Sequence, residues 1–202
     1  HRALTDLPMQ VTFVAKPLAE VDACALIAGV VEGASPDHLT GGGLAEAVGA
    51  ALADGGFKGE DGSTETLYPV PGLAARRVVL AGVGKDELTA EGWRKAVGAA
   101  MSELRGKART VAIVPPPGLN PVVAAGAAAE AAVMAAYDGR LYQTKKEDGE
   151  KPFETLVLLG PDDDRAADAA RRGASLGRLV NRARDLSNMP GNKLIPPELK
   201  EA

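Results

Sequence analysis

The chain has 202 residues, a formal net charge of −4 at pH 7 and one cysteine. Its length fits one domain, or one domain with a connecting segment, and its 46% hydrophobic fraction can supply an ordinary core. The charge gives no general attraction to nucleic acid, Cys24 alone cannot form an intrachain disulfide, and no apolar stretch is long enough to span a bilayer. We therefore expect a cytoplasmic protein without a signal peptide or a membrane partner.

The first strand-like pattern begins at Met9, and residues 1–8 are interpreted as an expression remnant or an upstream extension outside the fold. Apolar runs and alternating patterns predict six strands in the rest of the chain. The predicted strands cover residues 10–15, 23–31, 65–70, 76–83, 110–114 and 155–159.

Four helices are predicted between and after these strands, from apolar residues at helical spacing. The first ends at Gly55, and the second follows Thr89, a preferred N-cap residue. The third opens at Asn120 and Pro121, which is the order of a cap and a first-turn proline. The fourth covers about residues 162–188.

Strands that alternate with helices predict a three-layer α/β domain over residues 9–160. Several of the strands are apolar throughout, which is typical of a mostly parallel or mixed sheet flanked by helices on both faces. The first two predicted strands lie close together in the chain. We therefore expect them to form a mixed or antiparallel edge of the sheet.

The last predicted helix, within residues 161–188, would extend about 40 Å at 1.5 Å per residue, which is long for such a domain. We interpret it as a linker that packs on the sheet at its start and leads the chain away at its end. Its predicted packing face consists of Ala166, Ala169, Ala170, Gly173, Leu176, Val180 and Ala183. Its other faces carry Arg171, Arg172, Arg178 and Arg182.

The end of this helix carries the most informative motif of the chain. Pro190 prevents the helix from continuing past Asn188, and Asn192 tolerates a left-handed turn conformation. Pro196 fits the first turn of a new helix. We interpret residues 189–202 as the start of a further domain.

Asn188, Pro190 and Asn192 form an Asn-x-Pro-x-Asn turn that resembles the interdomain junction of the leucyl aminopeptidase family, the two-metal cytosolic exopeptidases. Two further segments are similar to this family in order and spacing. Residues 80–85 resemble its strand that ends in Gly-x-Gly-Lys. Residues 130–146 resemble its Ala-rich helix, with the aromatic Tyr137 and a lysine-containing exit at Lys145 and Lys146.

The resemblance implies an N-terminal, non-catalytic domain with a macro-domain-like fold, followed by a linker helix. Its implied interdomain junction consists of Asn188, Pro190, Asn192 and Pro196. The parent enzyme releases N-terminal amino acids from peptides with two divalent ions, Mn or Zn, held by a catalytic domain that this sequence lacks. Implied partners are that catalytic domain, the other subunits of a hexamer and, through the catalytic domain, a peptide substrate.

Independently of the resemblance, we expect no catalytic, cofactor-binding or metal-binding residue in this sequence, and so an inactive chain. His38 stands alone in a turn, without a ligand partner at suitable spacing. Cys24 lies in an apolar strand pattern and is interpreted as a small buried side chain. The triplet of residues 162–164 is interpreted as an exposed acidic helix cap, with a weak cation site as the alternative.

Two glycine-rich turns keep other functions open. Residues 82–85 lie between a strand and a helix, where an anion could bind. However, Asp86 stands where a Walker loop needs Ser or Thr. We therefore interpret residues 82–85 as a tight turn. Residues 41–43 are interpreted as a flexible turn. The alternative function is a free-standing macro-like module that binds an ADP-ribose-type ligand or nucleic acid. Against nucleic acid stand acidic residues throughout the chain and a lack of interleaved aromatic residues.

Overall fold

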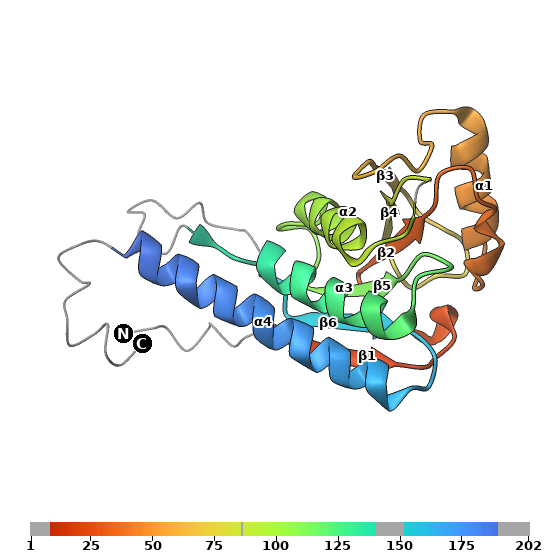
Figure 1. Cartoon of the computed structure of the whole chain (residues 1–202). Coiled ribbons are helices and arrows are strands. Elements are labelled where there is room, and N and C mark those ends of the chain that lie inside the picture. The colour runs from red at the N-terminus through yellow and green to blue at the C-terminus, as the bar shows by residue number, and fades with distance from the viewer. Residues whose placement is uncertain (1–8, 86, 140–151, 190–202) are drawn as a thin grey trace.

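Six strands form one sheet in the residues that the computed structural model describes, which are 9–85, 87–139 and 152–189 (Figure 1). They are β1 Gln10–Val14, β2 Ala25–Val30, β3 Thr64–Leu67, β4 Arg77–Gly82, β5 Thr110–Val114 and β6 Thr155–Leu159. Their order across the sheet is β1-β6-β5-β2-β4-β3. Neighbouring strands are parallel except for β3 and β4, which are antiparallel. The six predicted strands are confirmed.

The expected edge made by the first two strands is wrong. β1 lies at one edge and pairs with β6, whereas β2 lies inside the sheet between β5 and β4. The physical reason is burial: β2 is buried at all six positions and needs a neighbour on each side, whereas β1 is at most half-buried. The antiparallel edge is β3, whose sequence TETL is mostly polar, as is common in edge strands.

Four α-helices lie in the described ranges: α1 Leu44–Asp54, α2 Ala90–Glu103, α3 Pro121–Ala135 and α4 Asp164–Asn188. Both predicted N-caps are confirmed, because Thr89 Oγ1 accepts the Gly92 N–H at 3.1 Å and Asn120 Oδ1 accepts the Val122 N–H at 2.9 Å. α1 ends at Gly55, which has a φ of +79°. None of these helices combines the length and the apolarity of a membrane span.

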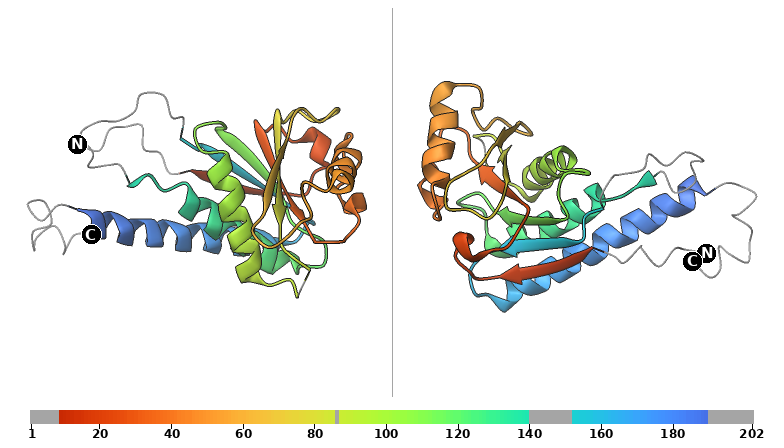
Figure 2. Two further views of the ribbon diagram at one scale, coloured as in Figure 1. Left: turned by 90° about the horizontal axis from the view of Figure 1, so that it is seen from above. Right: turned by 180° about the vertical axis from the view of Figure 1, so that it is seen from behind.

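Helices cover both faces of the sheet, which confirms the three-layer α/β fold (Figure 2). α2, α3 and α4 pack on one face, and α1 packs on the other. Successive side chains of β2 alternate between these layers, with Ile27 toward α2 and α3, and Leu26 toward α1. Trp93 of α2 is 1% exposed, and its Nε1–H donates to the Ala124 carbonyl of α3 at 3.1 Å. The buried indole thus joins two helices of the same layer.

Helix α4 packs lengthwise against α3, and glycines permit the close contact. A Cβ atom at Gly173 would lie 2.1 Å from the carbonyl oxygen of Gly126. One at Gly177 would lie 2.9 Å from the carbonyl oxygen of Glu130. The two backbones therefore approach to a distance that a side chain would prevent.

The predicted packing face of α4 is correct in its first half and wrong in its second. Ala166, Ala169, Ala170 and Gly173 are buried as expected. However, Leu176 is 51% exposed and Ala183 is exposed, whereas Ala174 and Gly177 are buried. The predicted stripe consists mostly of small residues, but in its second half it continues through Leu176 to Ala183, whereas the contact with α3 continues through Ala174 and Gly177; Val180 of the predicted stripe is half-buried. As a result α4 rests on α3 well beyond the part that the sheet could cover.

We predict that Gly173→Ala lowers the free energy of unfolding by about 1–3 kcal/mol, because the new methyl group meets the Gly126 backbone and must push the helices apart. Urea unfolding of the 202-residue chain, followed by circular dichroism, measures this difference.

The matched control is Gly98→Ala in α2, where a Cβ atom would meet nothing within 4 Å. Alanine there should stabilise the chain by about 0.5–1 kcal/mol, through its higher helix propensity. Equal effects of the two substitutions would contradict the close helix contact.

Candidate functional site at the end of helix α4

Three polar side chains hold the last turns of α4 against the end of α3. We call them the junction clamp: Asn181, Arg184 and Asn188. Asn181 Nδ2 donates to the Val133 carbonyl at 2.8 Å, and Arg184 Nη1 donates to the Met134 carbonyl at 3.1 Å. Asn188 Nδ2 donates to Tyr137 Oη at 3.1 Å. The residues lie three and four positions apart, so they share one face of the helix.

The clamp adds hydrogen bonds to the last carbonyls of α3. The last carbonyls of a helix have no partner inside it. Arg105, just after α2, donates to one more of them, the Ala135 carbonyl, and to the Tyr137 carbonyl just beyond the helix. Arg105 and Arg184 thus bring two positive charges to the negative end of the α3 dipole. Hydrogen bonds from Arg105, just after α2, and from the clamp residues of α4 therefore meet at the end of α3.

Tyr137 is the centre of the clamp on the α3 side. The Arg184 guanidinium lies over its ring, 5.6 Å from the centroid. Burial raises the pKa of Tyr137 above its ordinary value, and the hydrogen bond and charge of Asp185 raise it further, against the opposing effects of Asn188 and Arg184. The phenol therefore stays neutral at physiological pH and serves as a hydrogen-bonding group.

The clamp residues Asn181 and Arg184, and Arg105 beside them, were not singled out from the sequence. A signal was present, because Gly173, Gly177, Asn181, Arg184 and Asn188 follow one another at spacings of three and four. A stripe of apolar residues does not reveal it, since three of these five residues are polar.

We predict that Arg184→Ala frees the end of α4 from α3, because it removes the bonds to Met134 and Asn181 and the contact with Tyr137. Amide hydrogen exchange over residues 181–188 should become roughly fivefold faster or more, as expected for the loss of about 1 kcal/mol of net hydrogen bonding.

Arg182→Ala is the matched control, since Arg182 is exposed on another face of the same helix. It should leave the exchange rates of residues 181–188 unchanged. Exchange that accelerates equally in both variants would mean that the clamp does not hold the helix end.

The predicted interdomain junction begins where α4 ends. Asn188 is the last residue of the helix, and Met189 has extended backbone angles, φ −67° and ψ 128°, as expected before a proline. Pro190, Asn192 and Pro196 lie outside the described residues, as do Lys145 and Lys146. The division of the chain at residues 160 and 188, and the role of residues 189–202 as the start of another domain, stay predictions.

The turn after β4 uses its backbone donors within the chain. The N–H groups of Gly82, Val83 and Gly84 donate to the carbonyls of Ser63, Val30 and Gly59. A Cβ atom at Gly82 would lie 2.2 Å from the Glu60 carbonyl oxygen. This geometry supports the tight-turn interpretation over a phosphate-binding loop, because these three amides are not free for an anion. Asp86 lies outside the described residues.

The second glycine-rich turn is also filled by backbone. Gly43 N–H donates to the Pro71 carbonyl at 2.8 Å, and a Cβ atom at Gly42 would lie 2.7 Å from that oxygen. Nearby, the carboxyl end of β2 is closed, since a Cβ atom at Gly29 would lie 2.6 Å from Pro116. Ligands of open α/β sheets bind at such carboxyl ends. The close backbone contacts there do not favour an ADP-ribose-type site.

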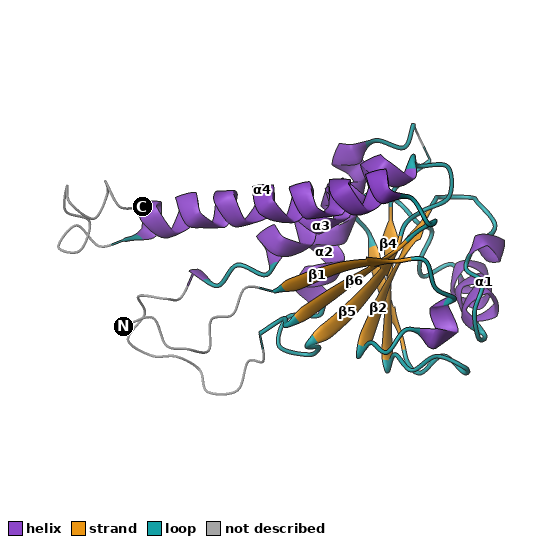
Figure 3. Ribbon diagram, turned by 90° about the horizontal axis from the view of Figure 1, so that it is seen from below, coloured by secondary structure: helices purple, strands orange, loops and turns teal. Residues whose placement is uncertain are grey.

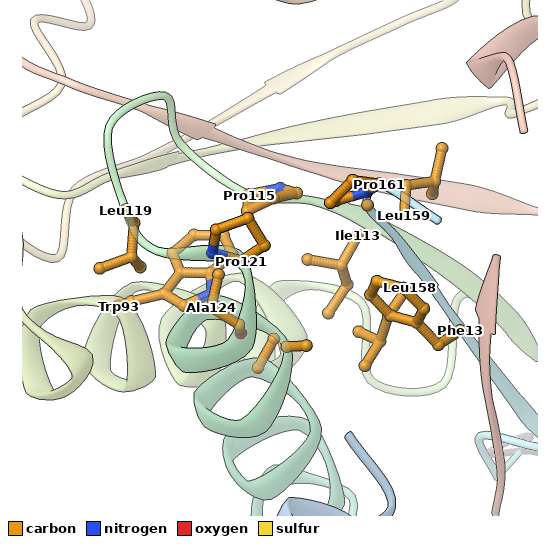
Figure 4. Close-up of a pocket in the computed structure, with 13 residues that line it drawn as sticks. Phe13, Trp93, Ile113, Pro115, Leu119, Pro121, Ala124, Leu158, Leu159 and Pro161 are labelled. Atoms are coloured by element: carbon orange, nitrogen blue, oxygen red, sulfur yellow. Dashed lines mark hydrogen bonds between the residues drawn. The ribbon is translucent and has the colours of Figure 1, made fainter. Parts of the chain in front are cut away.

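A small apolar cavity of about 50 Å³ lies beside the carboxyl ends of β5 and β6 (Figure 4). Phe13, Trp93, Ile113, Leu158 and Pro161 point toward it from the sheet, from α2 and from the loop after β6. Its lining contains no charged side chain. The cavity therefore has no group that could transfer a proton or hold a metal ion.

The other candidate residues are separate from one another. Asp163, from the acidic triplet, caps α4 through the Arg165 N–H, and its hydrogen bonds from Arg165 lower its pKa. His38 Nε2 lies 3.4 Å from the Gly29 carbonyl oxygen. Within the described ranges, no three His, Cys, Asp or Glu side chains come together in a way that could hold a metal ion.

The expectation that Cys24 is buried is wrong. Its side chain is exposed, because β2 begins one residue later, at Ala25. The Cys24 backbone still pairs with both neighbours, through its N–H to the Thr110 carbonyl and its carbonyl to the Arg76 N–H. The apolar pattern of β2 was therefore extended too far toward the N-terminus.

The arginines of α4 are partly engaged within the domain. Arg171 pairs with Asp168, and Arg178 Nη2 donates to the Met9 carbonyl at 3.1 Å. Arg172 and Arg182 are exposed. Since Leu176 and Leu179 are exposed beside these arginines, the face is mixed rather than a continuous basic track, and it does not favour nucleic acid.

A comparison with protein families matches residues 29–146 to the N-terminal domain of the cytosol aminopeptidase family. The probable cytosol aminopeptidase of Acidobacterium capsulatum is 33% identical over 163 residues, which cover 78% of this chain and 32% of that protein. The probable cytosol aminopeptidase of Solibacter usitatus is 32% identical over 196 residues, which cover 96% of this chain and 39% of that protein. The chain therefore spans less than half the length of these curated relatives.

Solved structures show the same relationship. The bottromycin maturation enzyme BotP in complex with Mn matches with a TM-score of 0.68 and 26% identity, over 89% of this chain and 35% of that one. A mutant of tomato leucine aminopeptidase matches with a TM-score of 0.72 over 98% of this chain and 42% of that one. At 19% identity, the second match supports the fold alone.

The three-layer fold and the packed pair of helices α3 and α4 define an N-terminal α/β domain of the aminopeptidase type. The family match covers more than half of the described fold, and two relatives exceed 30% identity over most of the chain. The chain belongs to the cytosol aminopeptidase family. The predicted resemblance of the chain to the N-terminal domain of the leucyl aminopeptidase family is thereby confirmed.

Proposed function

We propose that this chain is the non-catalytic N-terminal domain of a metal-dependent leucyl aminopeptidase, and that its role is architectural. In this proposal the domain positions the catalytic portion of the same cytoplasmic enzyme and contributes to a hexameric assembly. The observation that carries it is the junction clamp. Because the clamp joins the last turns of α4 to α3, α4 leaves the sheet in a fixed direction.

The proposed parent reaction is the release of N-terminal amino acids from peptides. Two divalent ions, Mn or Zn, would polarise the scissile carbonyl and supply an activated water in the catalytic portion. The described part of this chain does not fit such ions, since no group of three suitable donor side chains lies within it. We therefore assign no step of the reaction to its residues.

The geometry of α4 suits the architectural role. The helix is held to α3 at its middle by Gly173 and Gly177, and at its end by the clamp. A helix fixed at two places can transmit the orientation of one domain to another, whereas a helix fixed only at its start would swing. This is why the clamp, and not the length of α4 alone, supports the proposal.

We predict that the purified 202-residue chain does not hydrolyse a leucine anilide in the presence of added manganese or zinc. The same domain joined to a catalytic portion of its family should hydrolyse it, and a chelator should abolish that activity. Release of the aniline product, followed by absorbance, measures both.

A mock purification is the control for a contaminating peptidase. Turnover by the 202-residue chain that is abolished by chelator and absent from the mock purification would overturn the proposal that the chemistry resides elsewhere.

A further inference from the structure

The face of α4 that points away from α3 carries a row of apolar side chains. We call it the outer seam: Leu176, Leu179, Ala183 and Leu186. Leu176 is 51% exposed and Leu179 is 65% exposed, Ala183 is exposed and Leu186 is half-buried. The spacings of three, four and three residues are those of the apolar positions in a helix that packs against another helix or surface.

Leu176 and Leu179 of the outer seam belong to neither hydrophobic core of the described residues. The face toward α3 is made of alanines, glycines and the clamp residues, while Leu176 and Leu179 lie on the solvent side. In the described residues the exposed large hydrophobic side chains are Tyr68, Val123, Leu176 and Leu179. Two of these four thus lie within one turn of the same helix. A grouping of this kind marks an interaction surface more often than a single exposed leucine does.

We propose that the outer seam docks on an apolar surface of the catalytic portion of the same polypeptide. This proposal rests on the proposed function and adds the surface through which α4 acts. The family match describes an N-terminal domain, and the curated relatives extend well beyond the part that this chain covers. Leu186 lies two residues before Asn188, so the seam runs up to the predicted junction.

The position of α4 supports this occupant. The second half of the helix extends beyond the ends of the strands and has α3 on one side only (Figure 3). A domain that follows Asn188 in the chain would start beside this exposed half. The exposed apolar surface nearest to that following domain would be the outer seam.

The size of the seam also favours an intramolecular contact over a second copy of the chain. A stable interface between separate proteins buries about 800 Å² on each partner, which is far more than four side chains offer. A tethered domain does not need this area, because a short connection gives an effective concentration in the millimolar range. The exposed Arg172 and Arg182 lie next to the seam, so the opposite surface should be apolar with acidic residues at its rim.

Thiol labelling tests the accessibility of the seam directly. Leu179→Cys is made in a Cys24→Ser background, because Cys24 is itself exposed. Val123→Cys in the same background is the matched control, since Val123 is an exposed apolar residue of α3 outside the seam. Both cysteines should react rapidly with a maleimide in the 202-residue chain. Joined to the catalytic portion, the cysteine at position 179 should react at least tenfold more slowly, while the cysteine at position 123 should not change.

A second variant keeps the test independent of a cysteine side chain. Leu176→Glu with Leu179→Glu should leave the thermal midpoint of the 202-residue chain unchanged, because both residues are exposed there. In the longer polypeptide it should accelerate protease cleavage at the junction several-fold, with Val123→Glu as the control.

Two results would overturn the inference. One is equal labelling of position 179 in the short and long polypeptides, and the other is a concentration-dependent protection of position 179 in the 202-residue chain, which would assign the seam to a second copy. If the longer polypeptide hydrolyses the leucine anilide while position 179 labels freely, the seam proposal fails and the proposed function stands.

Discussion

The close contact between α3 and α4 is the constraint on which the rest of the molecule depends. It requires glycine at Gly173 and Gly177, because a side chain at either position would meet the backbone of α3. Small residues on that face leave the leucines of α4 on the opposite side. The same contact brings Asn181 and Arg184 within reach of the last carbonyls of α3. One packing requirement thus determines which face of α4 is buried and which face stays available.

The carboxyl end of the sheet beneath this helix pair is filled by close contacts, at the place where many α/β proteins have a ligand-binding crevice. At the carboxyl end of β2, Gly29 lies against Pro116, and the glycines near residue 42 pack on the backbone of Pro71. The turn after β4 satisfies its own amides. Glycine is used here for contact between backbones and not for contact with a ligand. The fold therefore provides a rigid body with its polar network at one helix end, which suits a domain that positions another.

Much of the fold was accessible from the sequence. Thr89, Asn120 and Gly55 mark helix ends through interactions with backbone groups two or three residues away, and such local signals do not depend on the remaining structure. The fully apolar strands predicted burial on both faces. The order of the strands was not accessible in the same way, because neighbours in the chain need not be neighbours in the sheet, and the expected pairing of β1 with β2 was wrong for that reason. Cys24 was predicted to be buried because the apolar pattern does not show that the strand begins one residue later, at Ala25.

The sequence by itself determined the fold class, the helix ends, the long last helix and, through Asn188 and the prolines after it, the family. These features depend on local backbone preferences and on the period of apolar residues. Only the tertiary structure decided which side of α4 is buried. A helical pattern identifies apolar residues, but whether the larger or the smaller ones face inward depends on the distance to the opposing backbone. That distance is set where Gly173 meets the backbone of Gly126, which lies far from α4 in the chain and is brought next to it only by folding.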